Sequence, residues 1–492
     1  MEVPSYVWGL ESILSFTGSG STLVGSPDIA QDAALNTYFV VAVQGTNTNL
    51  TAPPTTLSIA NIAVGCVSLN GTLLWYQFFP ELIVTTTAQS QPCIVIGTNN
   101  DLYVSFTTPG STQNNFNMAN VPIFCPCINP GPLDVVVARI NYTASGAKVA
   151  WVVQNARINS CANEQLSQLA IDPISNLVYV VLQTNGSVNC STPIGTTNLV
   201  LSCFTLNGVQ RWLETQALLN GSGQNQNPTI AADTQGGVYV AFESTASGTQ
   251  QIQLLKFQTT ATSYTKAWSL SGLTSMGGVS SSPSMCINLN ETHIFLGFLT
   301  TGSVGGNSPT GSAHDMVAVA ITPAGTIQWI RQGTQFNQLP YTYADASQPY
   351  MTVDQNNNMT FTLLTYSASP TAGQQSVFLF KVKPSDGSSV YSINGFNNFP
   401  IAYSGSSVAI LPSGPSGSFT KAAVNAPNGY LTVVLGTQVP LPGQTKTSSN
   451  YDIAILNYAL HTTYMNISPF TFMTQNKLIC TCNGACSCSS AT

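Results

Sequence analysis

Four cysteines near the C-terminus are the residues whose spacing most clearly suggests chemistry. They fall within nine residues, as Cys480-Thr-Cys482-Asn-Gly-Ala-Cys486-Ser-Cys488. Zinc held by four thiolates usually has ligand pairs separated by two to four residues, so two Cys-x-Cys pairs fit a zinc site less well. Disulfide bonds, within the chain or to another chain, are the favoured prediction. A bound metal and free thiols remain as alternatives.

A second group of cysteines is expected to staple a long loop. Cys125-Pro-Cys127 lies in a long insertion of the second repeat, and Cys161 follows it. We predict a disulfide or a cross-link here as well. The other cysteines lie in or beside apolar strand runs, where some are expected to be buried small hydrophobic residues. They are Cys66, Cys93, Cys190, Cys203 and Cys286.

Residues suited to catalysis are sparse. The three histidines, His293, His314 and His461, stand at different positions within their repeats. The sequence contains no Gly-x-Ser-x-Gly elbow, no His-Glu-x-x-His helix and no glycine-rich phosphate loop. The Ser-x-Asp-x-Gly-x-Thr-Trp hairpin of sialidases is absent too. The sequence therefore predicts a protein that is not an enzyme, with no catalytic residue, cofactor or metal.

An aspartate or asparagine begins one apolar strand run in several repeats. Such a ring of side chains would supply ligands around a central channel. A carboxylate or amide in this position more often bonds the nearby backbone at a strand or turn, which is the favoured interpretation. The residues are Asn61, Asp134, Asn198, Asp315 and Asp452.

Asn-x-Ser/Thr sequons would permit N-glycosylation at nine positions. The chain is so rich in Asn, Ser and Thr that chance alone explains this number. The sequons therefore allow glycans on surface loops without indicating that any is attached. The acceptors are Asn49, Asn70, Asn141, Asn185, Asn189, Asn220, Asn290, Asn358 and Asn466.

These residues are carried by a unit of about 60 residues that recurs seven times. Each unit ends in a large aromatic residue, usually preceded by a turn glycine, as in Gly71-Thr-Leu-Leu-Trp75. A second phrase, an aromatic or large apolar residue inside an alternating run such as Val-Tyr239-Val-Ala-Phe, also occurs once per unit. The period-two alternation and the turn residues between runs predict four short strands in each unit.

Seven four-stranded antiparallel sheets packed around an axis would bury both faces of every sheet. The sequence therefore predicts an all-β, seven-bladed β-propeller over residues 1–470, with the tryptophans wedged between adjacent sheets. An N-terminal strand at 5–15 is expected to close the ring with the last blade, replacing or flanking a weak strand at Tyr464. The ring would thus be closed by N- and C-terminal strands, and residues 471–492 would form a cysteine-rich tail.

One repeat also carries a family resemblance. The phrase Asp315-Met-Val-Ala-Val-Ala-Ile-Thr-Pro-Ala-Gly325-Thr-Ile-Gln-Trp329 resembles the SBBP-type β-propeller repeat and is similar to repeats of the quinoprotein type. The resemblance extends over residues 7–467. It implies a propeller but no particular activity, because a fold does not specify a function. The fourth and seventh units depart from the pattern, since they lack the turn glycine.

Charge is scarce in this chain. Only 6% of its residues are charged, against about 25% in an ordinary protein. A neutral polar surface suits close packing against other copies, a wall or a capsid. The 12 basic residues are scattered, which argues against a nucleic-acid partner. No amphipathic or long apolar segment indicates membrane insertion.

The two ends of the chain and its cysteines suggest a location. The segment Met1-Glu-Val-Pro-Ser-Tyr6 lacks the basic region of a secretion signal, so standard secretion is not expected. Twelve cysteines nevertheless suit an oxidising environment. A virion protein, assembled in the cytoplasm and exposed later, would satisfy both observations. The composition, rich in neutral Ser, Thr and Asn, resembles that of structural proteins of large DNA viruses. The expected location is a virion or an extracellular surface.

Three functions remain open on the sequence alone. The favoured one is a non-enzymatic structural or surface protein, capsid-associated, with other structural proteins or copies of itself as partners. The alternative is a module that binds surface glycans or a protein through the loops 104–131, 300–314 and 336–346. The least favoured is a quinoprotein- or lyase-like enzyme. Aromatic residues suited to sugar stacking in those loops include Phe116, Phe124, Phe336 and Tyr341.

Overall fold

The computed structural model contains seven sheets of four or more strands in the part of the chain that it describes. The prediction of an all-β fold built from four-stranded antiparallel sheets is confirmed. The described residues are 3–11, 22–23, 26–46, 56–83, 89–97, 101–109, 133–143, 146–155, 157–270, 273, 275, 277–309, 314–335, 349–366, 374–388, 390, 403–404, 407–409, 414–415, 423–425, 430–437, 452–461, 479–482 and 486–489.

Successive strands along the chain form one sheet and then the next. Sheet 1 contains β2 (Thr22–Leu23), β3 (Asp28–Gln31), β4 (Thr37–Thr46), β5 (Thr56–Val67) and β6 (Leu73–Phe78). Sheet 2 contains β7 (Ser90–Ile96), β8 (Leu102–Thr108), β9 (Asp134–Thr143) and β10 (Gly146–Val153). Sheet 3 contains β11 (Glu164–Asp172), β12 (Leu177–Thr184), β13 (Asn198–Thr205) and β14 (Gln210–Glu214).

The second half of the chain repeats this order. Sheet 4 contains β15 (Asn225–Ala232), β16 (Gly237–Ser244), β17 (Gln251–Thr259) and β18 (Tyr264–Leu270), and sheet 5 contains β19 (Ser280–Ile287), β20 (Ile294–Thr300), β21 (Asp315–Ile321) and β22 (Ile327–Gln332). Sheet 6 contains β23 (Tyr350–Val353), β24 (Met359–Tyr366), β25 (Gln374–Val382), β26 (Tyr403–Ser404), β27 (Ser407–Ala409) and β28 (Gly414–Pro415). Short 3-10 turns lie at η1 (Pro80–Leu82), η2 (Val188–Cys190) and η3 (Gly333–Gln335).

Sheet 7 joins the two ends of the chain. It contains β29 (Ala423–Asn425), β30 (Tyr430–Thr437) and β31 (Asp452–His461), and its outermost strand is β1 (Val3–Glu11), which pairs antiparallel with β31. The strand expected around Tyr464 lies outside the described residues. The last two strands, β32 (Ile479–Cys482) and β33 (Cys486–Ser489), pair only with each other.

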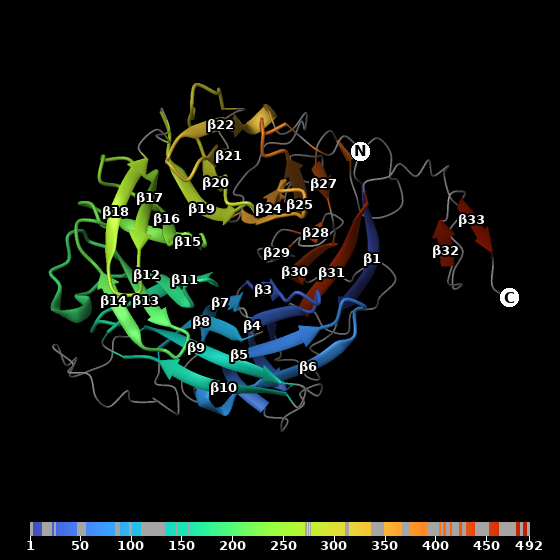
Figure 1. Cartoon of the computed structure of the whole chain (residues 1–492), viewed down its shortest axis with the longest axis horizontal. Coiled ribbons are helices and arrows are strands. Elements are labelled where there is room, and N and C mark those ends of the chain that lie inside the picture. The colour runs from blue at the N-terminus through green and yellow to red at the C-terminus, as the bar shows by residue number, and fades with distance from the viewer. Residues whose placement is uncertain are drawn as a thin grey trace.

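The sheets stand around a common axis in the arrangement of a β-propeller (Figure 1). The first strand of each unit lies nearest the axis, and each of these inner strands contacts the next, in the order β3, β7, β11, β15, β19, β23 and β29. The inner strand β29 of sheet 7 also contacts β3 of sheet 1. The inner strands therefore lie beside the axis and contact one another in succession.

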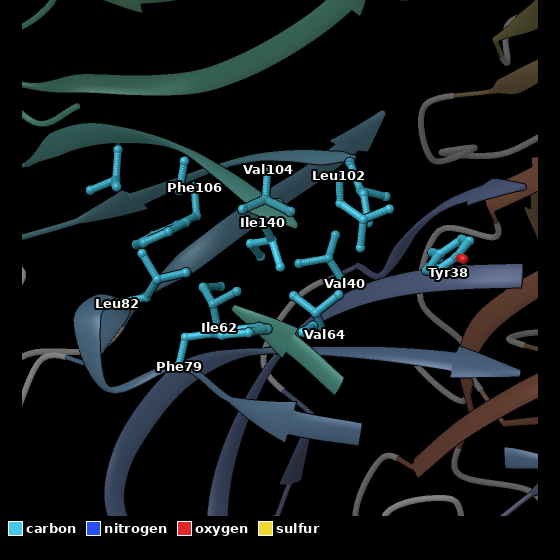
Figure 2. Close-up of a cluster of buried hydrophobic side chains, with 14 of the residues drawn as sticks. Tyr38, Val40, Ile62, Val64, Phe79, Leu82, Leu102, Val104, Phe106 and Ile140 are labelled. Atoms are coloured by element: carbon cyan, nitrogen blue, oxygen red, sulfur yellow. The ribbon is translucent and has the colours of Figure 1, made fainter. Parts of the chain in front are cut away.

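The hydrophobic core lies between the sheets rather than within any one of them. Figure 2 shows one such cluster, in which Tyr38, Val40 and Ile62 of sheet 1 face Val104 and Phe106 of sheet 2. Because side chains alternate along a strand, the neighbours of those residues face the other way. On that second face, residues of β4 pack against residues of sheet 7. The residues on this face are Phe39, Val41, Val434, Ile453 and Ile455.

In four of the sheets, a tryptophan on the outer strand is hydrogen-bonded to the next sheet, whereas Nε1 of Trp75 in sheet 1 is buried without such a bond. The indole Nε1 of Trp151 on β10 donates to the carbonyl of Leu206, in the β13–β14 turn of sheet 3, at 2.9 Å. The same bond joins sheets 4 and 5, from Trp268 to Pro323 at 3.0 Å. The expected wedge is therefore also a hydrogen-bonded link. Equivalent bonds run from Trp212 to Thr260 and from Trp329 to Pro384.

The turn glycine of the repeat is explained by the tryptophan of the preceding sheet. Gly208 has a left-handed φ of 78°, and a Cβ there would lie 2.8 Å from Cδ2 of Trp151. Sheet 4 lacks the glycine, and Tyr264 occupies the equivalent contact, with its ring centroid 4.5 Å from that of Trp212. The departure noted in the sequence is thus compensated by a ring–ring contact.

Replacing this glycine should cost more than backbone strain alone. Gly208→Ala places a methyl group against Trp151, whereas Gly248→Ala, at a φ of 89°, meets nothing within 4 Å. Both variants carry the left-handed strain of about 1–2 kcal/mol, and we expect Gly208→Ala to lose on the order of a further 1–3 kcal/mol from overpacking. Urea denaturation of the two variants measures the difference. Equal losses would show that the tryptophan contact has no part in the choice of glycine.

Candidate functional site

The inner strands bring six different polar side chains to one cavity on the axis. The cavity has a volume of about 140 Å³ and is lined by residues of β3, β7, β11, β15, β19 and β23. One residue of each strand occupies an equivalent position in the repeat, and we call this set the axial ring. Its members are Asp28, Cys93, Gln168, Thr229, Ser284 and Tyr350.

A recurring bulge at the start of the inner strands sets the position of the axial ring. Two residues before the ring position, the backbone is left-handed, with φ of 53° at Gln91, 55° at Leu166, 50° at Asn227 and 56° at Ser282. The strand pairing shifts by a residue at each of these points. Such bulges commonly re-aim side chains beside a site.

Side chains of the neighbouring sheet hold these strained residues in place. Gln183 Oε1 accepts from the N–H of Asn227 at 3.1 Å, and Glu243 Oε1 accepts from the N–H of Ser282 at 2.7 Å. Gln91 Oε1 likewise accepts from the N–H of Leu166 at 3.0 Å. Three of the four bulges are therefore anchored across a sheet boundary, which connects the inner strands of sheets 2 to 5.

Asp28 is the acid of the axial ring, and its carboxylate is held by several donors. Tyr350 Oη donates to Oδ1, which also accepts from the N–H of Ile29 at 2.9 Å. Oδ2 accepts from the N–H of Ile94 at 2.8 Å. Asp28 therefore links sheets 1, 2 and 6 at the axis. Burial and the nearby Asp28 charge raise the pKa of Tyr350 well above its ordinary value, so the phenol is held as a neutral donor.

The rest of the pocket is uncharged. Gln168, Thr229 and Ser284 supply an amide and two hydroxyl groups, and the Cys93 sulfur lies 4.0 Å from Oε1 of Gln168. Apolar side chains complete the lining: Ile94, Val95, Leu169, Ile230, Met285 and Met351. The arrangement can donate and accept hydrogen bonds from several directions while presenting an apolar wall.

Sequence reasoning missed this site, although the sequence holds a signal for it. In five of the six strands, proline precedes the ring residue and an apolar residue follows it, while in β11 a serine replaces the proline. Proline lacks the N–H that a strand ladder needs, which suits the bulge. The five triplets are Pro27-Asp28-Ile29, Pro92-Cys93-Ile94, Pro228-Thr229-Ile230, Pro283-Ser284-Met285 and Pro349-Tyr350-Met351.

The predicted cysteine sites are only partly within the described residues. Cys161 is disulfide-bonded, and so is Cys190, which was expected beside a strand and lies exposed at η2. Cys125 and Cys127 lie outside the described residues. The thiols of Cys66 and Cys203 are buried, and burial raises the pKa of each to about 12. In the β32–β33 hairpin, Cys480 is opposite Cys488 and Cys482 is opposite Cys486.

One of the asparagines in the predicted glycosylation sequons is buried. Asn220 is only 4% exposed, its Nδ2 donates to the carbonyls of Leu199 and Thr215, and its Oδ1 accepts from the N–H of Leu199. A glycan on Nδ2 has no room and would break these bonds. Asn70, Asn185, Asn189 and Asn290 are exposed, Asn141 and Asn358 are half-buried, and Asn49 and Asn466 lie outside the described residues.

His293 and Asn198, two other residues considered in the sequence, make local packing or backbone contacts. His293 stacks on Phe295 with ring centroids 6.0 Å apart, and burial lowers its pKa. Asn198 accepts from the backbone N–H groups of Ile194 and Gly195, as expected of a residue that caps a turn. Within the described ranges, no three His, Cys, Asp or Glu side chains gather as metal ligands, and no helix has the length and apolar character to cross a membrane.

Comparison with known proteins adds the following. Neither a protein-family model nor a curated protein matches the sequence. Among solved structures, the chain is similar to a protein of unknown function from Dyadobacter fermentans, with a TM-score of 0.40 and 9% identity over 93% of this chain and 99% of that one. It is also similar to a Penicillium chrysogenum alpha-L-arabinanase complexed with arabinobiose (TM-score 0.41, 11% identity, 77% and 94% covered).

A further similarity is to the NanB sialidase from Streptococcus pneumoniae, with a TM-score of 0.41 and 12% identity over 93% of this chain and 70% of that one. Enzymes are therefore among the similar structures, and this corrects two sequence-based expectations, that the protein is non-enzymatic and structural and that it is not an enzyme. At these identities the likeness concerns the overall arrangement and transfers no activity to this chain.

The bond between Tyr350 and Asp28 should contribute to stability as a hydrogen bond to a charged acceptor. We expect Tyr350→Phe to lose about 1.5–3 kcal/mol in the free energy of unfolding. The control is Tyr179→Phe, which removes a bond of 2.7 Å to the neutral hydroxyl of Thr259 and should lose about 0.5–1.5 kcal/mol. Denaturant unfolding of both variants tests this ranking, and a reversed order would mean that Asp28 does not depend on the phenol.

Proposed function

We propose that the chain binds a small neutral sugar, or the terminal unit of a longer glycan, in the axial pocket. The observation that carries this proposal is the axial ring, in which an acid, a thiol, an amide, two hydroxyls and a phenol converge on one cavity. Sugar hydroxyls both donate and accept hydrogen bonds, so a mixed set of partners suits them. The predominance of uncharged groups favours a neutral ligand over an anion.

The size of the pocket limits the ligand. Its volume of about 140 Å³ is close to that of a cavity of about 150 Å³ that admits benzene. It is smaller than the roughly 300–1,000 Å³ of a drug-sized site. One six-membered ring is therefore the most that the pocket holds, and Ile230 and Met285 in the lining would contact its apolar face. The remainder of a longer ligand would lie outside.

Hydrolysis of a glycosidic bond in the same pocket is the second candidate. The contact between Tyr350 and Asp28 favours it, because an adjacent base is what activates a hydroxyl nucleophile. The raised pKa of Tyr350 opposes ionisation of the phenol, which is why binding is placed first. A second acid near the axis would be needed to protonate the leaving group.

The proposal also covers the location of the protein and the closure of the ring. The disulfide-bonded Cys161 and Cys190 support an extracellular setting, where surface glycans are available. We also propose that the seven sheets form a closed ring, supported by the contact between β29 and β3 and by the pairing of β1 with β31. The SBBP-type assignment, the viral source, and the absence of nucleic-acid and membrane partners stay predictions.

Calorimetric titration of the full chain with a panel of neutral monosaccharides and short oligosaccharides tests the proposal. We expect saturable binding that weakens at least tenfold in Thr229→Val, because one good hydrogen bond accounts for a factor of about ten. The control, Thr265→Val on the exposed face of β18, should bind like the parent. If the parent protein also releases reducing ends from an oligosaccharide and Asp28→Asn does not, the pocket hydrolyses glycosidic bonds as well as binding sugars. Absence of binding across the panel would rule out the sugar site.

A further inference from the structure

We call the boundary between two consecutive sheets a joint. Four joints contain an equivalent backbone hydrogen bond. In each, the residue at the start of the inner strand donates its N–H to a carbonyl in the third strand of the preceding sheet or immediately before it. The bonds run from Gln89 to Ala60 (2.9 Å), Glu164 to Leu133 (2.9 Å), Asn225 to Thr197 (2.9 Å) and Ser280 to Gln250 (3.0 Å).

This shared bond identifies equivalent side chains at the four joints. Each joint has a pair formed by the donor residue and the residue after the acceptor carbonyl. Three of these pairs are uncharged and one consists of two acids. The pairs are Asn61 and Gln89, Asp134 and Glu164, Asn198 and Asn225, and Gln251 and Ser280.

The uncharged joints satisfy their polar groups because amides both donate and accept. In the joint between sheets 3 and 4, Nδ2 of Asn225 donates to the carbonyl of Gly221 at 2.9 Å, while its Oδ1 accepts from Oγ of Ser244 at 3.1 Å. In the next joint, Nε2 of Gln251 donates to the carbonyl of Gly278 at 3.1 Å. A carboxylate at either position has no proton to give.

The acidic joint between sheets 2 and 3 leaves two oxygens unsatisfied. Glu164 is fully buried, and its Oε1 accepts from the hydroxyls of Ser160 and Thr184 at 2.5 and 2.6 Å. Asp134 is 8% exposed, and its Oδ2 accepts from Nε2 of Gln154 at 3.1 Å. The other oxygens, Oε2 of Glu164 and Oδ1 of Asp134, are buried with no partner.

No described basic group compensates this pair. The charge that acts on Glu164 is that of Asp134. Arg157, in the turn that connects the two sheets, takes part in none of the described ion pairs, and burial lowers its pKa. Arg139, on the same strand β9 as Asp134, pairs with Asp101 at 2.7 Å. Two ionised carboxylates would thus be buried in one joint, on residues brought together by the backbone bond from Glu164 to Leu133, an arrangement that favours retention of a proton.

We propose that Asp134 and Glu164 share one proton, so that the joint between sheets 2 and 3 is closed when the pair is protonated and loosens when it ionises. A single proton satisfies both orphaned oxygens, because one carboxyl then donates to the other. Ionisation leaves two like charges on adjoining sheets. β11 also carries Gln168 of the axial ring, so loosening of this joint reaches the pocket.

The direction of the pH dependence follows from the two states. Burial, with a smaller contribution from the Asp134 charge, raises the pKa of Glu164 from 4.5 to about 7, and burial also raises that of Asp134. The folded chain therefore holds a proton that the unfolded chain releases. The stability from this pair is complete below about pH 4.5 and is lost as the pH rises through about 7.

Hydrogen exchange followed by mass spectrometry on the full chain tests the proposal. Between pH 6 and pH 8, after correction for the intrinsic exchange rate, we expect protection over residues 160–170 to fall on the order of tenfold, as one pKa unit allows. Residues 221–231, in the uncharged joint of sheet 4, should keep their protection. In Glu164→Gln, which restores an amide like that of Gln89, the fall should disappear.

Two further variants separate a local effect from a general one. Asp134→Asn, which matches Asn61 and Asn198, should also remove the fall, and it serves if Glu164→Gln does not fold. Asp315→Asn changes an acid at the position of sheet 5 that is equivalent to Asp134. It should leave unchanged the loss of protection between pH 6 and pH 8. The proposal is overturned if Glu164→Gln keeps the parent's pH dependence. It is equally overturned if calcium chloride restores protection at pH 8, because the pair would then hold a cation.

Discussion

Every sheet in this chain has two apolar faces, and the need to cover both determines the rest of the structure. The clusters of buried side chains lie between consecutive sheets, such as the one shared by sheets 3 and 4 and the one shared by sheets 4 and 5. A tryptophan of one sheet bonded to a turn of the next fixes how the two faces meet. Such pairs of sheets are thus held by a hydrogen bond at the outer strand, and their inner strands contact each other near the axis.

The inner strands have no sheet in front of them, so the packing rule that governs the other strands does not apply at the axis. Polar side chains at the axis can bond one another and the backbone of neighbouring inner strands, as Asp28 does with Tyr350 and Ile94. The bulge at Gln91, Leu166, Asn227 and Ser282 repeats in four sheets, while the ring residues differ in each. The backbone is thus the same in these sheets, while the side chain at the ring position differs from sheet to sheet. A repeated backbone can therefore surround the axis with a set of unlike side chains.

The sheet architecture could be predicted from the sequence because each recurring phrase has a packing reason. The turn glycine and the tryptophan recur together since Gly208 lies against Trp151 of the neighbouring sheet. The axial ring could not be found in the same way, because its six members differ in type and stand far apart in the chain. Only the proline before Asp28 and its equivalents marks them. A search for local motifs therefore does not find the axial ring.

Some of the few charged residues of this chain form ion pairs that are buried or largely buried in the fold. Lys381 and Asp354 form an ion pair in which both side chains are fully buried, and Asp101 bonds Arg139 near the turn that follows an inner strand. Together with Lys256, which pairs with Asp233, three of the described cations thus neutralise acids near the ends of inner strands. Asp134 and Glu164 lack such a cation although they are as deeply buried. Because a buried charge without a partner is costly, a proton is the simplest neutralising group for them.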